Sequence, residues 1–235
     1  MKTTRLLLLA AWLPAAGLAA PMQVPAGIDH APYDRLLKKY VNDRGLVNYR
    51  GWKENAGDLQ ALRAYTTQFA AKGETTDAAS LIDAYNALTI QWVLDNYPVK
   101  SIKATDSPWK AKRHRIGGRE VSLDEIEHDT LRPQVGYRTH AVLVCAAKSC
   151  PPLRAEAYTA EKLDEQLDDA MRRWLGREDL NRFLPAEKRV ELSKIFSWYG
   201  KDFDNLRAVL AKYGPMECPD CRISHRSYDW ALNEQ

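Results

Sequence analysis

One long apolar segment, residues 78–97, most restricts the folds that this chain can adopt. Its apolar side chains recur at helical spacing along two faces, with Leu81, Tyr85, Leu88 and Trp92 on one and Ile82, Ile90 and Val93 on the other. A helix that is apolar all round is buried. Asp83 and Asn86 lie inside it, so both polar side chains need partners in the interior. We expect this helix, stopped by Pro98, to be the centre of the fold.

The remaining pattern predicts one α+β domain over residues 33–235, preceded by an irregular segment, 20–32. Other helices are expected at 33–40, 59–73, 159–174, 195–199 and 203–213, and strands at 139–144 and 190–192. A hairpin turning at Gly117-Gly118 is expected within 112–122, and Ser122 with Glu125 predicts a capping box that begins a short helix. Helices dominate, and the β-α-β alternation of a parallel sheet is missing. We therefore expect a small, mostly antiparallel sheet that contains 139–144 and packs on the long helix. A remote papain- or transglutaminase-like arrangement would fit a buried helix beside a strand carrying His140.

The first nineteen residues have the three parts of a secretory signal peptide. Lys2 and Arg5 precede the apolar run 6–13, and small residues follow up to Ala20, which predicts cleavage after Ala19. The alternative is an uncleaved anchor, but the run is far shorter than the ~20 residues that span a bilayer. The sequence thus predicts a periplasmic or secreted protein with no membrane span after cleavage.

Charge gives no indication of a polyanionic partner. The chain has 34 basic and 31 acidic side chains, and two of the basic ones belong to the predicted signal peptide. The mature protein would be nearly neutral, so neither nucleic acid nor an anionic membrane surface is expected as a partner.

Four cysteines form two close pairs, and the first pair suggests either a disulfide or a thiol site. In an exported protein, Cys145 and Cys150 are expected to form a disulfide. Alternatively, Cys150 is a nucleophile with His140 as its base and Asn86 or Glu127 orienting the imidazole ring. Strand alternation would turn Cys145 away from His140, whereas Cys150, in the following loop, could reach either face. Pro151 favours an extended Cys150, which counts against a helix N-terminus there.

The second pair, Cys218 and Cys221, has the spacing of a zinc half-site or a redox motif. It lies in a turn that contains Pro219 rather than at the start of a helix. A structural disulfide is therefore the leading prediction, followed by zinc and then by redox catalysis; no other cofactor is expected.

Other candidate residues have simpler structural explanations. Asn86 more often bridges backbone groups than orients a catalytic ring. The indole and phenol rings of Trp109, Trp198, Tyr199 and Trp230 suit a core or an aromatic groove for peptide or glycan. His30 and His114 are expected at the surface. Phosphate-binding glycine loops, a Gly-x-Ser-x-Gly elbow and His-Glu-x-x-His do not occur in the sequence.

Several blocks together resemble the family catalogued as domain of unknown function 547. They are 83–88 (DAYNAL), 107–110 (SPWK), 117–119 (GGR), 122–128 (SLDEIEH), 140–153 (HAVLVCAAKSCPPL), 192–199 (LSKIFSWY) and 228–233 (YDWALN). The likeness extends from about Tyr33 to Asn233 but does not include the Cys218–Cys221 turn. Bacterial members resemble exported proteins, and similar domains end plant proteins with leucine-zipper segments, which implies a binding role in some settings.

Two functions follow as hypotheses. The first is a non-catalytic envelope domain that binds a peptide, glycan or protein partner and is crosslinked by the disulfides Cys145–Cys150 and Cys218–Cys221. The second is a thiol-dependent hydrolase or transferase acting on peptide, amide or cell-wall material. The position of the Cys150 sulfur relative to His140 should distinguish them.

Overall fold

A computed structural model describes residues 21–235 as one α+β domain, which confirms the predicted fold class. The predicted signal peptide and its cleavage site lie outside the described residues. The elements in chain order are α1 (Ala31–Tyr40), α2 (Tyr49–Lys53), α3 (Ala56–Gln68), α4 (Ala78–Asn96), η1 (Ile102–Ala104), β1 (His114–Ile116), β2 (Arg119–Val121), α5 (Leu123–Glu125), η2 (Ile126–Leu131), α6 (Arg132–Val135), η3 (Gly136–Arg138), α7 (Thr139–Val142), η4 (Ala160–Lys162), α8 (Leu163–Leu175), β3 (Arg182–Leu184), η5 (Pro185–Glu187), β4 (Arg189–Leu192), α9 (Ile195–Trp198), η6 (Gly200–Asp202), α10 (Leu206–Tyr213) and β5 (Arg222–His225).

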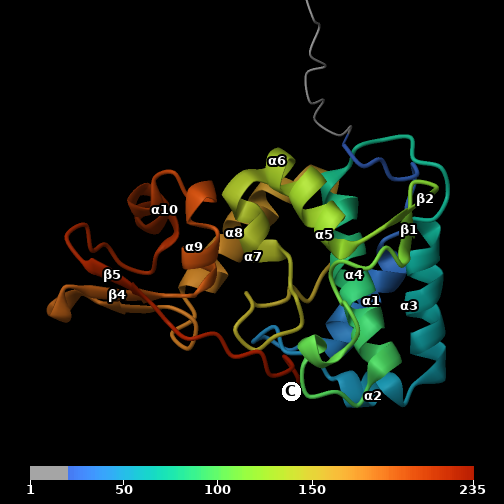
Figure 1. The fold of residues 1–235 in the computed structure, drawn as a ribbon, viewed down its shortest axis with the longest axis horizontal. Helices are drawn as coiled ribbons and strands as arrows, with labels where there is room; N and C mark the ends of the chain where they lie inside the picture. The colour runs from blue at the N-terminus through green and yellow to red at the C-terminus, as the bar shows by residue number, and fades with distance from the viewer. Residues whose placement is uncertain (1–20) are drawn as a thin grey trace, which may run out of the picture.

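Helix α4 is the buried centre, as its apolar faces predict. Every residue from Ala79 to Ile90 is buried, and Asp77 caps the helix by accepting a hydrogen bond from the Ala79 amide. Helices α1 to α3 pack together with α4 on one side of the molecule, and α5 to α7 lie between this group and α8 to α10 (Figure 1). Of the two polar residues inside α4, Asn86 bonds to residues 142–144, and Asp83 bonds to His30 and the Tyr158 amide.

The strands form two small sheets that are mostly antiparallel. Strands β1 and β2 make the predicted hairpin, with Gly117 and Gly118 both at positive φ in its turn. Strand β4 pairs antiparallel with β3 and parallel with β5. The predicted capping box follows the hairpin, where Ser122 and Glu125 exchange hydrogen bonds and begin α5.

The predicted strand over 139–144 is wrong, because residues 139–142 form helix α7. All four of these residues are buried, so the segment shows no alternation of inward and outward side chains. A short, fully buried apolar run fits a helix as well as a strand, and periodicity alone does not separate the two. The segment still packs beside α4, but as a short helix. It ends just before residues 145–150, which we call the cysteine loop.

The C-terminal tail crosses back over the molecule and holds that loop in place (Figure 1). The amides of Lys148 and Ser149 donate to the carbonyls of Ala231 and Asp229, and the Asn233 amide donates to Ala146. Residues far apart in sequence are thereby brought to one site.

Candidate functional site

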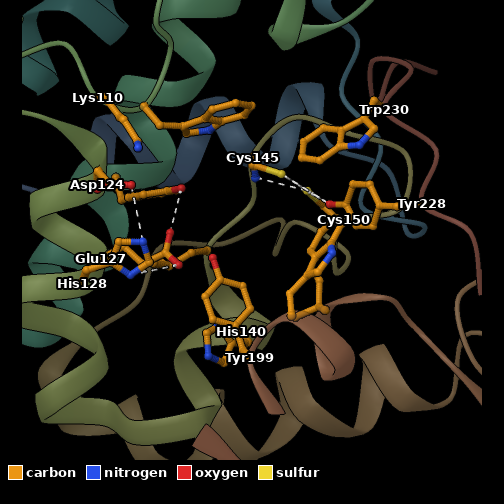
Figure 2. Close-up of a pocket in the computed structure, with 15 residues that line it drawn as sticks. Lys110, Asp124, Glu127, His128, His140, Cys145, Cys150, Tyr199, Tyr228 and Trp230 are labelled. Atoms are coloured by element: carbon orange, nitrogen blue, oxygen red, sulfur yellow. Dashed lines mark hydrogen bonds and ion pairs between the residues drawn. The ribbon is translucent and has the colours of Figure 1, made fainter. Parts of the chain in front are cut away.

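An aromatic cleft of about 310 Å³ lies between the α4–α5 side of the domain and the C-terminal elements. It is bounded by residues from α4, α5, η2, α7, α9, the cysteine loop and the C-terminal tail (Figure 2). Large apolar walls with a few polar groups are the usual composition of a ligand site. The cleft also contains three of the four predicted catalytic residues: Glu127, His140 and Cys150.

The aromatic wall of the cleft is a packed cluster of rings. Tyr228 lies between Trp198 and Trp230, with ring centroids 4.8 and 4.6 Å away, and Trp109 lies 5.8 Å from Trp230. Trp198 is 47 % exposed, the largest exposed fraction among the big apolar side chains of residues 21–235. An indole held by neighbouring rings yet open to solvent is available to a ligand.

Cys145 and Cys150 are free cysteines whose sulfurs lie 2.7 Å apart on the cleft wall (Figure 2). The Cys150 sulfur accepts a hydrogen bond from the Cys145 amide at 3.2 Å, and the Tyr228 hydroxyl lies 3.2 Å from it. Burial opposes ionisation of Cys150, but the donors from Cys145, Tyr228 and the backbone of Ala147 outweigh it and lower its pKa. The pKa of Cys145 is raised, first by its hydrogen bond with Cys150 and then by partial burial, which disfavours the ionised form.

His140 is engaged with Asp202 and not with Cys150. Its Nε2 lies 2.7 Å from Asp202 Oδ2, and its ring stacks on Tyr199 at 4.1 Å. Burial lowers the pKa of His140 to about 4 despite the attraction of Asp202, so the ring is neutral at pH 7. Figure 2 shows His140 beside Tyr199 and well apart from the two cysteines. Within residues 21–235, no hydrogen bond joins His140 to Cys150, so the geometry does not supply the predicted thiol–imidazole pair.

Asn86 does not orient the imidazole. Its amide donates to the Val142 carbonyl at 2.9 Å and accepts from the Val144 amide at 3.0 Å. The nitrogen and the oxygen of the side-chain amide thus each bond to a backbone group at the junction between α7 and the cysteine loop. These contacts match the structural explanation and give no support to a catalytic role.

Glu127 is a partly buried carboxyl group that borders the cleft. It lies in the π-helical segment η2, a type of local distortion often found at functional sites. The Tyr85 hydroxyl donates to it at 3.3 Å, and His128 Nδ1 lies 3.8 Å away. Burial raises the pKa of Glu127 against the opposing effects of His128 and the Tyr199 and Tyr85 hydroxyls. Glu127 does not orient His140, whose ion-pair partner is Asp202.

Asp202 is the site residue that sequence reasoning missed. It accepts two hydrogen bonds from Arg132, at 2.8 and 2.7 Å, as well as the contact with His140. It lies 62 residues after His140 in a short turn, and no motif marks it. The Asp202 carboxylate therefore fixes the imidazole from outside the predicted site.

The remaining cysteines and histidines lie elsewhere. Cys218 and Cys221 are joined as a disulfide, which supports the first of the three predictions for this pair. Across residues 21–235, no group of three or more His, Cys, Asp and Glu side chains is arranged to hold a metal ion. The prediction of surface positions for His30 and His114 is wrong: His114 is buried, and His30 is part-buried against Asp83.

His30 joins a buried polar cluster around α4. Its Nδ1 lies 2.9 Å from Asp83 Oδ2, and its Nε2 lies 3.0 Å from the Ser80 hydroxyl. The order Ser–His–Asp resembles a catalytic relay, but Ser80 is buried and donates to Asp77. The cluster supplies the partner that a buried Asp83 requires, together with the Tyr158 amide.

Comparison with known proteins supports the family resemblance. Residues 71–175 match the family described as "Protein of unknown function, DUF547". The matched segment contains α4, the hairpin, Glu127, His140 and both cleft cysteines, whereas Trp198, Tyr228 and Trp230 lie beyond it. Searches of curated proteins and of solved structures found no match, so nothing supports the remote papain- or transglutaminase-like arrangement.

Proposed function

We propose that the protein is an exported, non-catalytic domain whose aromatic cleft binds a glycan of the cell envelope. The observation that carries this proposal is the ring cluster of Trp198, Tyr228 and Trp230 on the wall of a 310 Å³ cleft. Sugar rings present flat C–H faces that pack on indoles, and their hydroxyls need hydrogen-bonding groups at the edge. Asp124 and Glu127 offer carboxyl groups for this purpose, and Lys110 offers a donor.

The same geometry favours binding over thiol-dependent hydrolysis. A thiol hydrolase needs a base beside its nucleophile. His140 is instead stacked on Tyr199 and hydrogen-bonded to Asp202. A binding domain needs only the shaped wall, which the packed rings provide.

Titration with chitotetraose, followed by tryptophan fluorescence and calorimetry, tests the glycan proposal. We expect saturable binding that Trp198→Ala weakens about tenfold, in the range typical for loss of an aromatic contact. Trp92→Ala is the matched control, because Trp92 packs under Arg113 outside the cleft and should leave affinity unchanged. Absence of binding, or equal losses in both variants, would refute the proposal; saturable binding of an unrelated peptide series alone would assign the cleft to peptides.

Export is a separate part of the proposal and rests on the sequence of residues 1–20. Among residues 21–235, no helix combines the length and apolar character needed to cross a membrane. We expect mass spectrometry of the protein from an envelope fraction to find an N-terminus at Ala20 or within two residues of it. A mature mass that retains Met1 would contradict cleavage.

A further inference from the structure

The cleft wall holds two thiols in a position from which they can bond to each other. The sulfurs of Cys145 and Cys150 are 2.7 Å apart, neither is bonded, and both border the cleft. We propose that Cys145 and Cys150 form a redox-active pair, which exchanges between dithiol and disulfide by reaction with a low-molecular-weight disulfide that enters the cleft. This activity is independent of whether the cleft binds a glycan.

The backbone of the cysteine loop holds the two sulfurs together. Ala146 is buried and has a φ of 59°, a left-handed conformation that is rare for alanine. The loop closes with a hydrogen bond from the Cys150 amide to the Ala147 carbonyl at 3.0 Å, and the Cys145 amide points at the Cys150 sulfur. Unusual backbone conformations of this kind persist where the surrounding structure enforces them, often at functional sites.

The surroundings also divide the roles of the two cysteines. The amides of Cys145 and Ala147 donate to the Cys150 sulfur, and the Cys145 sulfur and the Tyr228 hydroxyl lie 2.7 and 3.2 Å from it, where both can donate to a thiolate. This set stabilises a thiolate on Cys150 and keeps the proton on Cys145. Cys145 is the less buried of the pair. Its sulfur lies 2.7 Å from that of Cys150, within reach for the second step.

The exchange then proceeds in two balanced steps. The Cys150 thiolate attacks one sulfur of the incoming disulfide, the disulfide bond breaks, and the departing thiolate takes a proton from water. Cys145 next loses its proton to solvent and attacks the Cys150 sulfur, releasing the second thiolate, which is protonated in turn. Counted from the Cys150 thiolate, the pair has lost two electrons and the one proton of Cys145, and the incoming disulfide has gained two electrons and taken two protons from solvent to become two thiols.

Cys218 and Cys221 provide an internal comparison. They are already joined, they lie outside the cleft, and Cys221 is buried. A structural pair of this kind should change little during exchange, so a response confined to Cys145 and Cys150 identifies a property of the cleft.

The test uses 2-hydroxyethyl disulfide as the probe on the chain of residues 20–235. The protein is treated with mild reductant, freed of it, exposed to the probe, quenched with an alkylating agent and mapped by mass spectrometry. We expect the 145–150 disulfide to form and to be reopened by mild reductant. In the Cys145→Ser variant, a mixed disulfide between the probe and Cys150 should accumulate. At pH 6 it should form at least about tenfold faster in the folded variant than in the same variant unfolded in urea, because more of the Cys150 thiol is ionised in the folded protein.

Tyr228→Phe measures the contribution of the hydroxyl donor. We expect this change to slow modification of Cys150 about tenfold, in line with the loss of one hydrogen bond to an anion. Tyr97→Phe is the control, since the Tyr97 hydroxyl donates to Glu234 outside the cleft and its loss should leave the rate unchanged. The proposal is overturned if Cys150 reacts no faster in the folded than in the unfolded chain, or if a 145–150 bridge resists mild reductant.

Discussion

At the residue scale, the ionisable groups buried around α4 make stability depend on pH. Burial alone would lower the pKa of His30, but its hydrogen bond to Asp83 and the negative charge there raise it above its ordinary value. A raised histidine pKa gives stability that is complete below the unfolded value of about 6.5 and is lost as the pH rises through the folded value. Burial also raises the pKa of Asp83, from 3.8 to about 6. This shift likewise makes the folded protein less stable as the pH rises, but over a lower pH range than the shift of His30.

We therefore expect the free energy of unfolding to fall as the pH rises from about 6.5 through the raised pKa of His30, because His30 loses its proton beside Asp83. Burial lowers the pKa values of His114 and His140 to about 4, so these two rings are neutral throughout that window. Urea unfolding at several pH values measures the slope. Asp83→Asn should flatten it, and a slope that persists in this variant would show that another group is responsible.

Asn86 illustrates how a single amide can hold two elements together. It satisfies one carbonyl and one amide of residues 142–144, and it is buried. We expect Asn86→Ala to destabilise the protein by about 2–4 kcal/mol, since two buried backbone groups lose their partners. Asn96→Ala is the control, because Asn96 lies at the exposed end of the same helix and bonds only to Trp92. Equal urea midpoints for the two variants would contradict the bridging role.

At the element scale, the sequence predicts best those elements whose signals are local. The glycine pair at 117–118 requires positive φ, and the Ser122–Glu125 box begins a helix by its own hydrogen bonds. Both appear as predicted, as does the all-round apolar helix α4. Helix α7 could not be predicted in this way, because its four residues are all buried and packing against α8 decides their conformation.

The residues of the site also fall into those that a local sequence signal predicts and those that only tertiary packing brings together. The cysteine loop and Glu127 could be identified from residue type and spacing, and both border the cleft. The link from His140 to Asp202 depends on how the turn after α9 packs on α7, and no short-range pattern encodes it. The strand alternation used to place Cys145 relative to His140 fails for the same reason, since that segment is a helix.

At the scale of the whole molecule, the C-terminal tail connects the first helices with the cleft. The Val47 amide donates to Asn233, the Lys148 amide donates to Ala231, and Tyr228 and Trp230 form part of the aromatic wall. Leu232 and Asn233 are buried, so the tail is part of the packed domain and not an appendage. Removing it should therefore affect both stability and the cysteine loop.

We expect a chain truncated after His225 to lose several kcal/mol of stability, at about 1 kcal/mol for each backbone hydrogen bond broken. Native-state hydrogen exchange should show lost protection at Lys148 and Ser149, whose amides donate to the tail, while the amides in the middle of α3 keep theirs. A chain lacking only Gln235 is the matched control, because the bonds to the cysteine loop come from residues 229–233. If the longer truncation left the urea midpoint and the protection of both amides unchanged, the tail would not be what holds the cysteine loop in place.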